Sequence, residues 1–425
     1  MEKLEGKKLL ILGATTETIP LVKKAESLGV ETFVCDPYPN APAKSFSSHP
    51  VDIDCFNVDG LIEIIVGQGV DGVLPGCADV LIPVYEEVCR KSNKNCYVNQ
   101  KTVEVFGNKK GLKDMLKKHG LPVIEEYTYE QVKNDSFDKF PIFLKPTDNN
   151  SSKGMSVVYD VNELDVAYQK ALDNSKSKTV LIEKYKTCND FFMGFLLQDG
   201  KASVTFTADR FVNRQQKGVG TITAGMIYPS KFSDLYFETT HKKMLDIFDE
   251  LGFKNGLMHI QGFVEDGKIE FYDPALRITG GQEYLALEKL YGLDLLRCLI
   301  NYALLGTIGD EDISSICDCT FGGKYLCNLA FSVKGCTIGR IDGVEYAKTY
   351  PTIINVTQEH YEGAVIDRIG TAQQNIFRMH LITETREQMR NSIVDLQKNV
   401  IAYDEKGNNV MLDGLDPYLW YANEY

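Results

Sequence analysis

Short apolar segments alternate with amphipathic helical segments through the first hundred residues, and this alternation leaves few folds open to the chain. We predict strands at residues 8–12, 31–36 and 72–75 and helices at 20–28, 59–67 and 80–91. Strands that alternate with helices in this way form parallel sheets covered by helices. The pattern therefore predicts a parallel, doubly wound α/β domain at the N-terminus.

The first predicted strand ends at Gly13, where a dinucleotide-binding domain would carry its phosphate loop. A complete G-x-G-x-x-G motif is absent, because Gly13 is the only glycine of the turn. The sequence therefore disfavours NAD binding. The proline-rich loop at 37–42 follows a strand and should lie at the carboxyl end of the sheet, where ligands enter such folds. It can equally be a plain connecting loop.

A second feature is the stretch 141–159, in which two short apolar runs flank a small, polar connection. This pattern is typical of a hairpin whose loop exposes backbone N–H groups. Lys145 ends the first run, so its ammonium group could face the same anion that the loop covers. The stretch therefore indicates a phosphate-binding hairpin, although an ordinary surface hairpin fits equally well.

Residues 256–277 form a third informative block. They read as two antiparallel strands joined by an Asp-Gly turn at 266–267. On paired strands, Gln261 and Asp273 could present two oxygen ligands to one metal ion that also contacts a triphosphate. Arg277 follows as a candidate phosphate clamp.

The composition limits the kinds of partner that the chain can have. Its 425 residues carry a formal net charge of −13, which disfavours nucleic acid or an anionic membrane surface as the main partner. The apolar runs are too short to span a bilayer, and a secretory signal is absent from the first residues. The 11 cysteines lack paired spacing and suit reduced thiols. We therefore expect a cytoplasmic protein.

Some polar residues have a structural interpretation beside a functional one. The clustered cysteines are Cys317, Cys319, Cys327 and Cys336. Their spacing is unusual for zinc, so we interpret them as packing residues. The polar residues after a predicted strand are Asp209, Arg210, Asn213 and Arg214. They could grip a carboxylate substrate or form a solvated turn. His259, inside a predicted strand, is more readily a buried structural histidine than a catalyst.

Together these motifs resemble the ATP-grasp superfamily, whose members use ATP to join a carboxylate to a nucleophile through an acyl phosphate. The resemblance covers nearly the whole chain, because the N-terminal unit is similar to the domain that precedes ATP-grasp modules in carbamoyl-phosphate synthase and in purine-pathway and amino-acid ligases. It implies a fold of mixed α/β and α+β class. The implied parts are an N-terminal α/β domain at 1–107, a mobile lid subdomain with its lead-in helix at 108–182, a main ATP-grasp subdomain at 183–310 and a C-terminal α+β domain at 311–425.

The resemblance also implies roles for individual residues. Lys109 and Lys145 match the two lysines that contact the ATP phosphates, and Arg277 matches the arginine facing the transferred phosphoryl group. The residues that match the lid loop are Ser151, Ser152, Lys153 and Gly154. The residues that match the adenine hinge and the ribose-binding acid are Glu183, Lys184, Tyr185 and Asp190. Gln261 and Asp273 fall where the family has its magnesium ligands.

The metal motif departs from the family pattern. Where the family has Glu-x-Asn-x-Arg, this chain reads Asp273-Pro-Ala275-Leu-Arg277, so an alanine replaces a ligating asparagine. Mg²⁺ needs only one or two carboxylates beside waters and substrate phosphates. Asp273 and Gln261 therefore suffice for at least one Mg²⁺, or for Mn²⁺, while the number of ions stays open.

The resemblance implies an ADP-forming ligase that couples a small carboxylate to an amine or a thiol, with Lys145, Arg277 and Mg²⁺ stabilising phosphoryl transfer. The alternative is a nucleotide-binding regulatory or scaffold protein with a degenerate metal site, and ADP release on addition of carboxylates would separate the two. A biotin carboxylase is disfavoured, because no Gln-Val-Glu-His stretch follows Arg277. Expected partners are small molecules, not nucleic acid or membrane, and a homodimer stays open.

Overall fold

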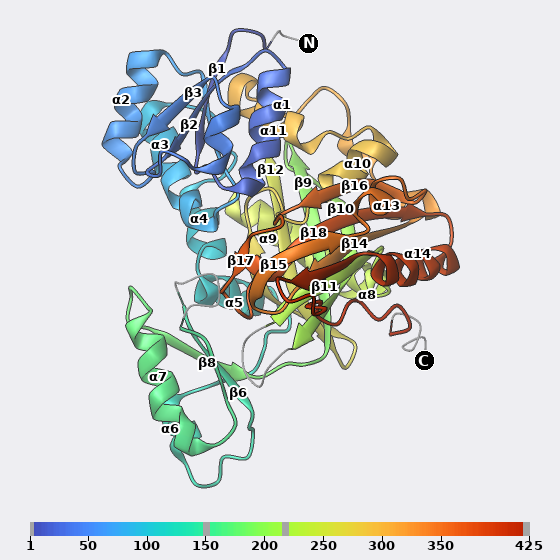
Figure 1. The fold of residues 1–425 in the computed structure, drawn as a ribbon. Coiled ribbons are helices and arrows are strands. Elements are labelled where there is room, and N and C mark those ends of the chain that lie inside the picture. The colour runs from blue at the N-terminus through green and yellow to red at the C-terminus, as the bar shows by residue number, and fades with distance from the viewer. Residues whose placement is uncertain (1–3, 148–153, 215–220, 420–425) are drawn as a thin grey trace.

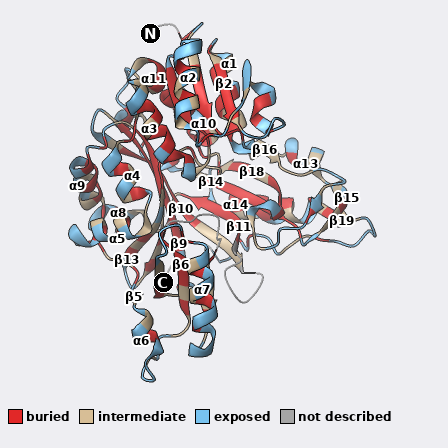
Figure 2. Ribbon diagram, turned by 90° about the vertical axis from the view of Figure 1, so that its left-hand side faces the viewer, coloured by how far each residue is buried: buried red, intermediate tan, exposed pale blue. Residues whose placement is uncertain are grey.

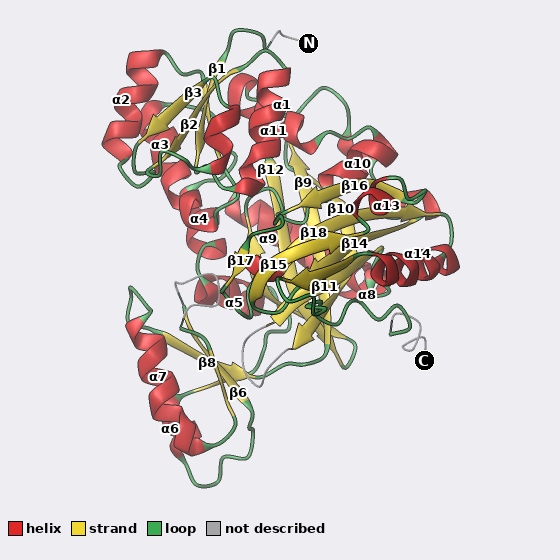
Figure 3. Ribbon diagram, viewed as in Figure 1, coloured by secondary structure: helices red, strands yellow, loops and turns green. Residues whose placement is uncertain are grey.

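The computed structural model describes residues 4–147, 154–214 and 221–419, and Figures 1 and 3 show the arrangement of its elements. The N-terminal domain holds a parallel sheet in the order β3-β2-β1-β4. Its elements are β1 (Lys8–Leu12), α1 (Ile19–Ser27), β2 (Glu31–Asp36), β3 (His49–Asp52), α2 (Val58–Gln68), β4 (Gly72–Pro75) and α3 (Ile82–Ser92). The predicted parallel α/β arrangement is confirmed.

Strand β1 lies inside this sheet because of its composition. Leu9, Leu10, Ile11 and Leu12 are fully buried, as expected for a run of apolar residues covered on both faces. Strand β3 was not predicted, because its residues His49–Asp52 are largely exposed and show no apolar pattern. The carboxyl ends of β1, β2 and β4 all lie at the same edge of the sheet. Short loops follow β1 and β4 at this edge.

A small subdomain follows, connected through α4 (Gln100–Phe106) and α5 (Lys109–Lys118). It projects below the N-terminal domain in the view of Figure 1. Its elements are β5 (Glu126–Tyr127), α6 (Tyr129–Lys133), β6 (Ile142–Pro146), β7 (Ser156–Val158), α7 (Leu164–Asp173) and β8 (Val180–Lys184). The strands form one sheet in the order β5-β8-β6-β7, and β6 and β7 pair antiparallel as predicted. Ile142, Leu144 and Ile182 belong to its separate apolar core.

The largest sheet has eight strands in the order β13-β12-β9-β10-β11-β14-β18-β16. These strands are β9 (Asn189–Gln198), β10 (Lys201–Arg214), β11 (Thr221–Tyr228), β12 (Gly256–Glu265), β13 (Lys268–Ala275), β14 (Tyr325–Ser332), β16 (Ile353–Gln358) and β18 (Asn375–Thr383). Figure 2 shows that buried residues concentrate along this sheet. The described helices beside it include α8 (Ser233–Thr239), α9 (His241–Leu251), α10 (Tyr284–Tyr291) and α12 (Ile313–Ile316), whereas α11 (Leu295–Leu305) packs against α1 and β4 of the N-terminal domain.

The C-terminal part adds a three-stranded sheet in the order β17-β15-β19. Its elements are β15 (Cys336–Asp342), α13 (Val344–Lys348), β17 (Val365–Ile366), α14 (Arg386–Asn399) and β19 (Ile401–Asp404). The domain limits stay predictions, although β8 spans the limit at 182 and the large sheet continues past the limit at 310. Among the described helices, every one is too short or too polar to cross a membrane.

Candidate active site

One cavity of about 780 Å³ lies where the N-terminal domain, the small subdomain and the large sheet meet. Its volume suits a small-molecule ligand. The predicted site residues that line it are Lys109, Lys145, Glu183, Lys184, Tyr185, Asp190, Gln261, Asp273 and Arg277. Gly154 is described but is not among the lining residues. The remaining residues predicted for the lid loop, 151–153, lie outside the described residues.

The two predicted phosphate lysines reach the cavity from different elements. Lys109 is the first residue of α5, whose start is capped by the side chain of Asn108. Lys145 lies on β6 with a side chain only 5% exposed, and its Nζ is 2.6 Å from Glu183 Oε2. Burial by itself would raise the pKa of Glu183, but the ion pairs with Lys145 and Lys113 lower it below its ordinary value. Glu183 is therefore an anion that anchors buried cations, a role that sequence reasoning missed.

Aromatic rings form part of the cavity wall. Phe263 on β12 and Tyr272 on β13 are stacked with their ring centroids 4.5 Å apart, and Phe143 lines the cavity from β6. Flat apolar surfaces of this kind suit a nucleobase. The signal for Phe263 was available in the sequence, because it lies two residues after Gln261 on the same face of a strand.

Asp190 is part of a polar network inside the cavity. Its Oδ2 lies 2.5 Å from Arg210 Nη1 on the neighbouring strand β10. The Tyr272 hydroxyl lies 3.2 Å from Asp190 Oδ1 and 2.7 Å from Gln261 Oε1, to which it donates. The network therefore connects the predicted ribose-binding acid to a predicted metal ligand, and it includes two residues, Arg210 and Tyr272, that were not predicted to act there.

The two predicted metal ligands are direct partners across the β12 and β13 pair, since Gln261 is in register with Asp273. Asp273 opens into the cavity. Its pKa is raised above its ordinary value, chiefly by desolvation; the charge of Lys109 opposes this rise and that of Asp79 adds to it. One carboxylate and one amide oxygen fit a Mg²⁺ ion that takes its other ligands from water and phosphate.

No further donor completes a protein-only metal cage in the described residues. Ala275 is buried and has no ligand atom. Within residues 4–147, 154–214 and 221–419, no group of three or more histidine, cysteine, aspartate or glutamate side chains is placed to hold a metal. All the cysteines are free thiols. A Mg²⁺ ion held by Asp273 and Gln261 would therefore take its remaining ligands from water and phosphate.

Arg277 contacts the N-terminal domain. Its Nε and Nη2 donate to the two carboxylate oxygens of Asp79 at 2.8 and 2.7 Å, and its Nη1 donates to the carbonyl of Ile278 at 2.9 Å. Asp79 begins a short 3-10 helix (Asp79–Leu81) that follows β4. The N-terminal domain thus contributes a carboxylate to the cavity, a contribution that no motif in the sequence predicted.

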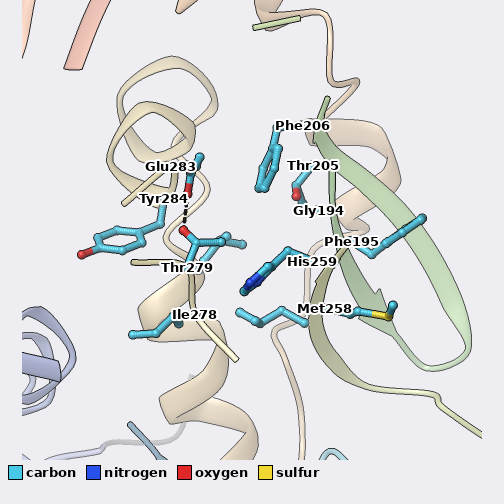
Figure 4. Close-up of a pocket in the computed structure, with 12 residues that line it drawn as sticks. Gly194, Phe195, Thr205, Phe206, Met258, His259, Ile278, Thr279, Glu283 and Tyr284 are labelled. Carbon is cyan, nitrogen blue, oxygen red and sulfur yellow. Dashed lines mark hydrogen bonds between the residues drawn. The ribbon is translucent and has the colours of Figure 1, made fainter. Parts of the chain in front are cut away.

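The turn after Arg277 is fixed by a buried carboxylate (Figure 4). The hydroxyl groups of Tyr228 and Thr279 donate to the two oxygens of Glu283. His259 lies nearby, at the edge of a cavity of about 20 Å³ that is large enough only for a water molecule. Burial lowers the pKa of His259 to about 3, and its Nδ1 lies 3.2 Å from the carbonyl of Arg277. This agrees with the structural role predicted for His259.

The described residues that we considered as a binding site for a substrate carboxylate do not lie around one common point. Asp209 accepts hydrogen bonds from the hydroxyl of Ser230 at 2.6 Å and from the backbone N–H of Lys231, whereas Arg210 lines the cavity. Asn213 contacts the carbonyl of Asp413. The Arg214 side chain lies outside the described structure. Among the described side chains of this group, Arg210 is the one that lines the cavity.

Comparisons with known proteins show what the chain is similar to in sequence and in fold. Residues 114–271 match the family of the D-ala D-ala ligase C-terminus. Over 190 residues the chain is 31% identical to a formate-dependent phosphoribosylglycinamide formyltransferase of Prochlorococcus marinus (strain MIT 9515), a match covering 43% of this chain and 48% of that protein. A protein of the same name from Wigglesworthia glossinidia brevipalpis is 25% identical over 275 residues, covering 62% of this chain and 67% of the relative.

The chain thus spans about half the length of the first of these relatives. Among solved structures, the L-amino acid ligase from Bacillus licheniformis has a TM-score of 0.77 at 19% identity, with 94% of this chain and 99% of that one covered. Phosphoribosylglycinamide synthetase from Anaerococcus prevotii has a TM-score of 0.71 at 17% identity, with 94% and 99% covered. The chain therefore has the fold of ATP-grasp ligases, and its residues 114–271 are similar in sequence to the D-ala D-ala ligase C-terminus.

Proposed function

We propose that the chain is an ATP-dependent ligase that activates a small carboxylate as an acyl phosphate and couples it to an amine or a thiol, releasing ADP and phosphate. The observation that carries this proposal is the cavity itself. It gathers the cations of Lys109, Lys145 and Arg277 around Asp273 and Gln261, in a protein whose net charge is −13. A local basic cavity in an acidic protein fits a polyphosphate ligand.

The chemistry follows from these positions. A carboxylate oxygen of the substrate attacks the terminal phosphorus of ATP, and the bond to ADP breaks. Lys145 and Arg277 neutralise the charge that spreads over the transferred group, and such preorganised electrostatics supply most of the catalysis in phosphoryl transfer. Asp273 and Gln261 would hold Mg²⁺, which when bound neutralises phosphate charge. The acceptor then attacks the acyl carbon, and phosphate leaves.

The relatives support the two kinds of substrate proposed here, a small carboxylate and an acceptor. The relatives are formate-dependent phosphoribosylglycinamide formyltransferases, and one structural neighbour is an L-amino acid ligase. The aromatic wall of Phe143, Phe263 and Tyr272 supports adenine as the base of the nucleotide.

The test is ADP formation from MgATP in the presence of a library of small carboxylates. The proposal expects ADP and phosphate, without AMP, only when the right acid is present. The Asp273→Asn variant should lose turnover by roughly two or more orders of magnitude, since it removes the carboxylate of the metal site. Asp234→Asn, an exposed aspartate on α8, serves as the matched control. Release of AMP, or full activity of Asp273→Asn, would contradict the mechanism.

The rival interpretation is a nucleotide-binding scaffold, and the structure has one feature in its favour: Ala275 stands where the family has a ligating asparagine. Parent protein that binds MgATP but forms no ADP with any acid would support the scaffold. The same library assay therefore separates the two functions.

A further inference from the structure

Lys113 is a buried cation behind the cavity wall. It lies on α5, one helical turn after Lys109, and its side chain is only 3% exposed. It is not among the residues that line the cavity. Its Nζ is 2.5 Å from Glu183 Oε1 and 2.6 Å from Glu126 Oε1, and it donates to the carbonyl of Ile124 at 3.0 Å.

Glu183 is shared between two cations from two different elements. Lys113 from α5 pairs with one carboxylate oxygen, and Lys145 from β6 pairs with the other at 2.6 Å. Glu183 itself is 1% exposed, so its charge has no access to solvent. Without Lys113, the buried carboxylate of Glu183 would pair with Lys145 and not with Lys113. It would then hold the Lys145 ammonium group more tightly.

The arrangement also links two parts of the fold. The helix that carries Lys109 is joined by Lys113 to the sheet that carries Lys145, because Glu183 lies on β8 beside β6. The distance between the two phosphate lysines is therefore set partly by this buried bridge. Since a polyphosphate site requires its cations at fixed spacing, the bridge bears directly on nucleotide affinity.

We infer that Lys113 is a positioning residue of the nucleotide site: by sharing Glu183 with Lys145 it keeps the Lys145 ammonium group available to phosphate. The inference rests on the proposed function for the identity of the ligand. Lys113 contacts no ligand, so it is not a catalytic residue.

The test is a double-mutant cycle on MgATP affinity, measured by calorimetry without any acid substrate. Lys113→Met and Lys145→Met should each weaken MgATP about tenfold or more, the effect of losing a hydrogen bond to a charged group. The double variant should bind about as weakly as Lys145→Met alone, because Lys113 acts only through Lys145. Lys118→Met, on the same helix, exposed and paired with Glu250 instead of with a partner of Lys113, is the control and should bind as the parent does.

The inference would be overturned if the double variant lost MgATP affinity by the product of the two single losses. It would also be overturned if folded Lys113→Met bound MgATP as tightly as the parent does. If Lys113→Met does not fold, the cycle is run in Glu183→Gln, where the carboxylate charge that needs Lys113 is gone. There, adding Lys113→Met should leave the affinity unchanged, and a further loss would show a direct role. Parent protein that fails to bind MgATP would instead contradict the proposed function, so the two failures are distinguishable.

Discussion

Two adjacent glycines in the turn after Arg277 should respond in opposite ways to the same small change. A Cβ atom at Gly281 would collide with the carboxylate of Glu283, lying 2.7 Å from its Cδ, whereas a Cβ at Gly280 would meet Glu17 Cγ at 3.7 Å, an ordinary contact. Both glycines have backbone angles outside the left-handed region. The difference between Gly280→Ala and Gly281→Ala is therefore a matter of space alone.

The loss of stability in Gly281→Ala depends on the group that the added Cβ displaces, which is the carboxylate of Glu283. Glu283 is 1% exposed, and it accepts hydrogen bonds from Tyr228 at 2.6 Å and from Thr279. Displacing a buried carboxylate with two such partners should lower the free energy of unfolding by roughly 3–5 kcal/mol. Gly280→Ala should change it by less than about 1 kcal/mol, with a gain expected from the restricted unfolded chain.

Urea denaturation of the two variants and the parent, followed by circular dichroism, measures this difference. A shift of the midpoint for Gly281→Ala, with the slope unchanged, is the expected result. The same turn carries Arg277 to the cavity, so Gly281→Ala should also bind MgATP more weakly where it is folded. Equal stability of the two alanine variants would refute the packing described for this turn.

Three further predictions concern the cavity and its surroundings. Replacing Lys109 or Lys145 by alanine should weaken MgATP binding by roughly 1.5–3 kcal/mol, since each ammonium group pairs with phosphate; calorimetry that shows unchanged affinity in both variants would remove them from the site. Tyr272→Phe deletes the hydroxyl that donates to Gln261 and should lower the free energy of unfolding by roughly 0.5–1.5 kcal/mol, as measured in urea; full stability would mean that the hydroxyl makes no net contribution. Burial lowers the pKa of His380 to about 4, so between this value and the ordinary 6.5 the unfolded chain binds more protons than the folded one, and stability falls as the pH falls. Between pH 7 and pH 5 the loss due to His380 should be roughly 1–2 kcal/mol, and His380→Gln should show a loss smaller by that amount; an equal loss in both proteins would contradict it.

Local sequence patterns predicted much of the fold, because the apolar runs and the turn residues were clear. The alternation of apolar runs and helices predicted the N-terminal sheet, and the turn at Asp266-Gly267 predicted the hairpin of β12 and β13. The turn alone would place Gln261 opposite Tyr272, whereas a register shift between Gln261 and Gly262 places Gln261 opposite Asp273. Strand β3 gave no signal, since it is short and exposed. Much of the C-terminal part was not predicted: β14 and β18 complete a sheet begun far away in the sequence, and such long-range pairing leaves no local sequence pattern.

The site was predictable where a local strand pattern or the resemblance supplied a motif. Lys145, Asp190 and Asp273 were placed by matching positions, and the structure brings them to one cavity. Asp79 and Lys113 could not be found in this way, because their partners Arg277 and Glu183 are 198 and 70 residues distant in the sequence. Contacts between residues so far apart in the sequence depend on the tertiary fold. The periodicity of apolar residues, in contrast, indicates only the structure of the segment in which they lie.

The fate of a carboxylate oxygen tests the central claim most directly. If the substrate acid attacks the terminal phosphorus of ATP, an acid labelled with ¹⁸O must transfer one labelled oxygen to the phosphate that is released, and added hydroxylamine must trap the acyl phosphate as a hydroxamate. Mass spectrometry of the phosphate after turnover of the parent protein reads this out, with Asp273→Asn as the inactive reference. The proposed mechanism predicts one ¹⁸O atom in each phosphate released. Phosphate that carries oxygen from water alone would contradict it.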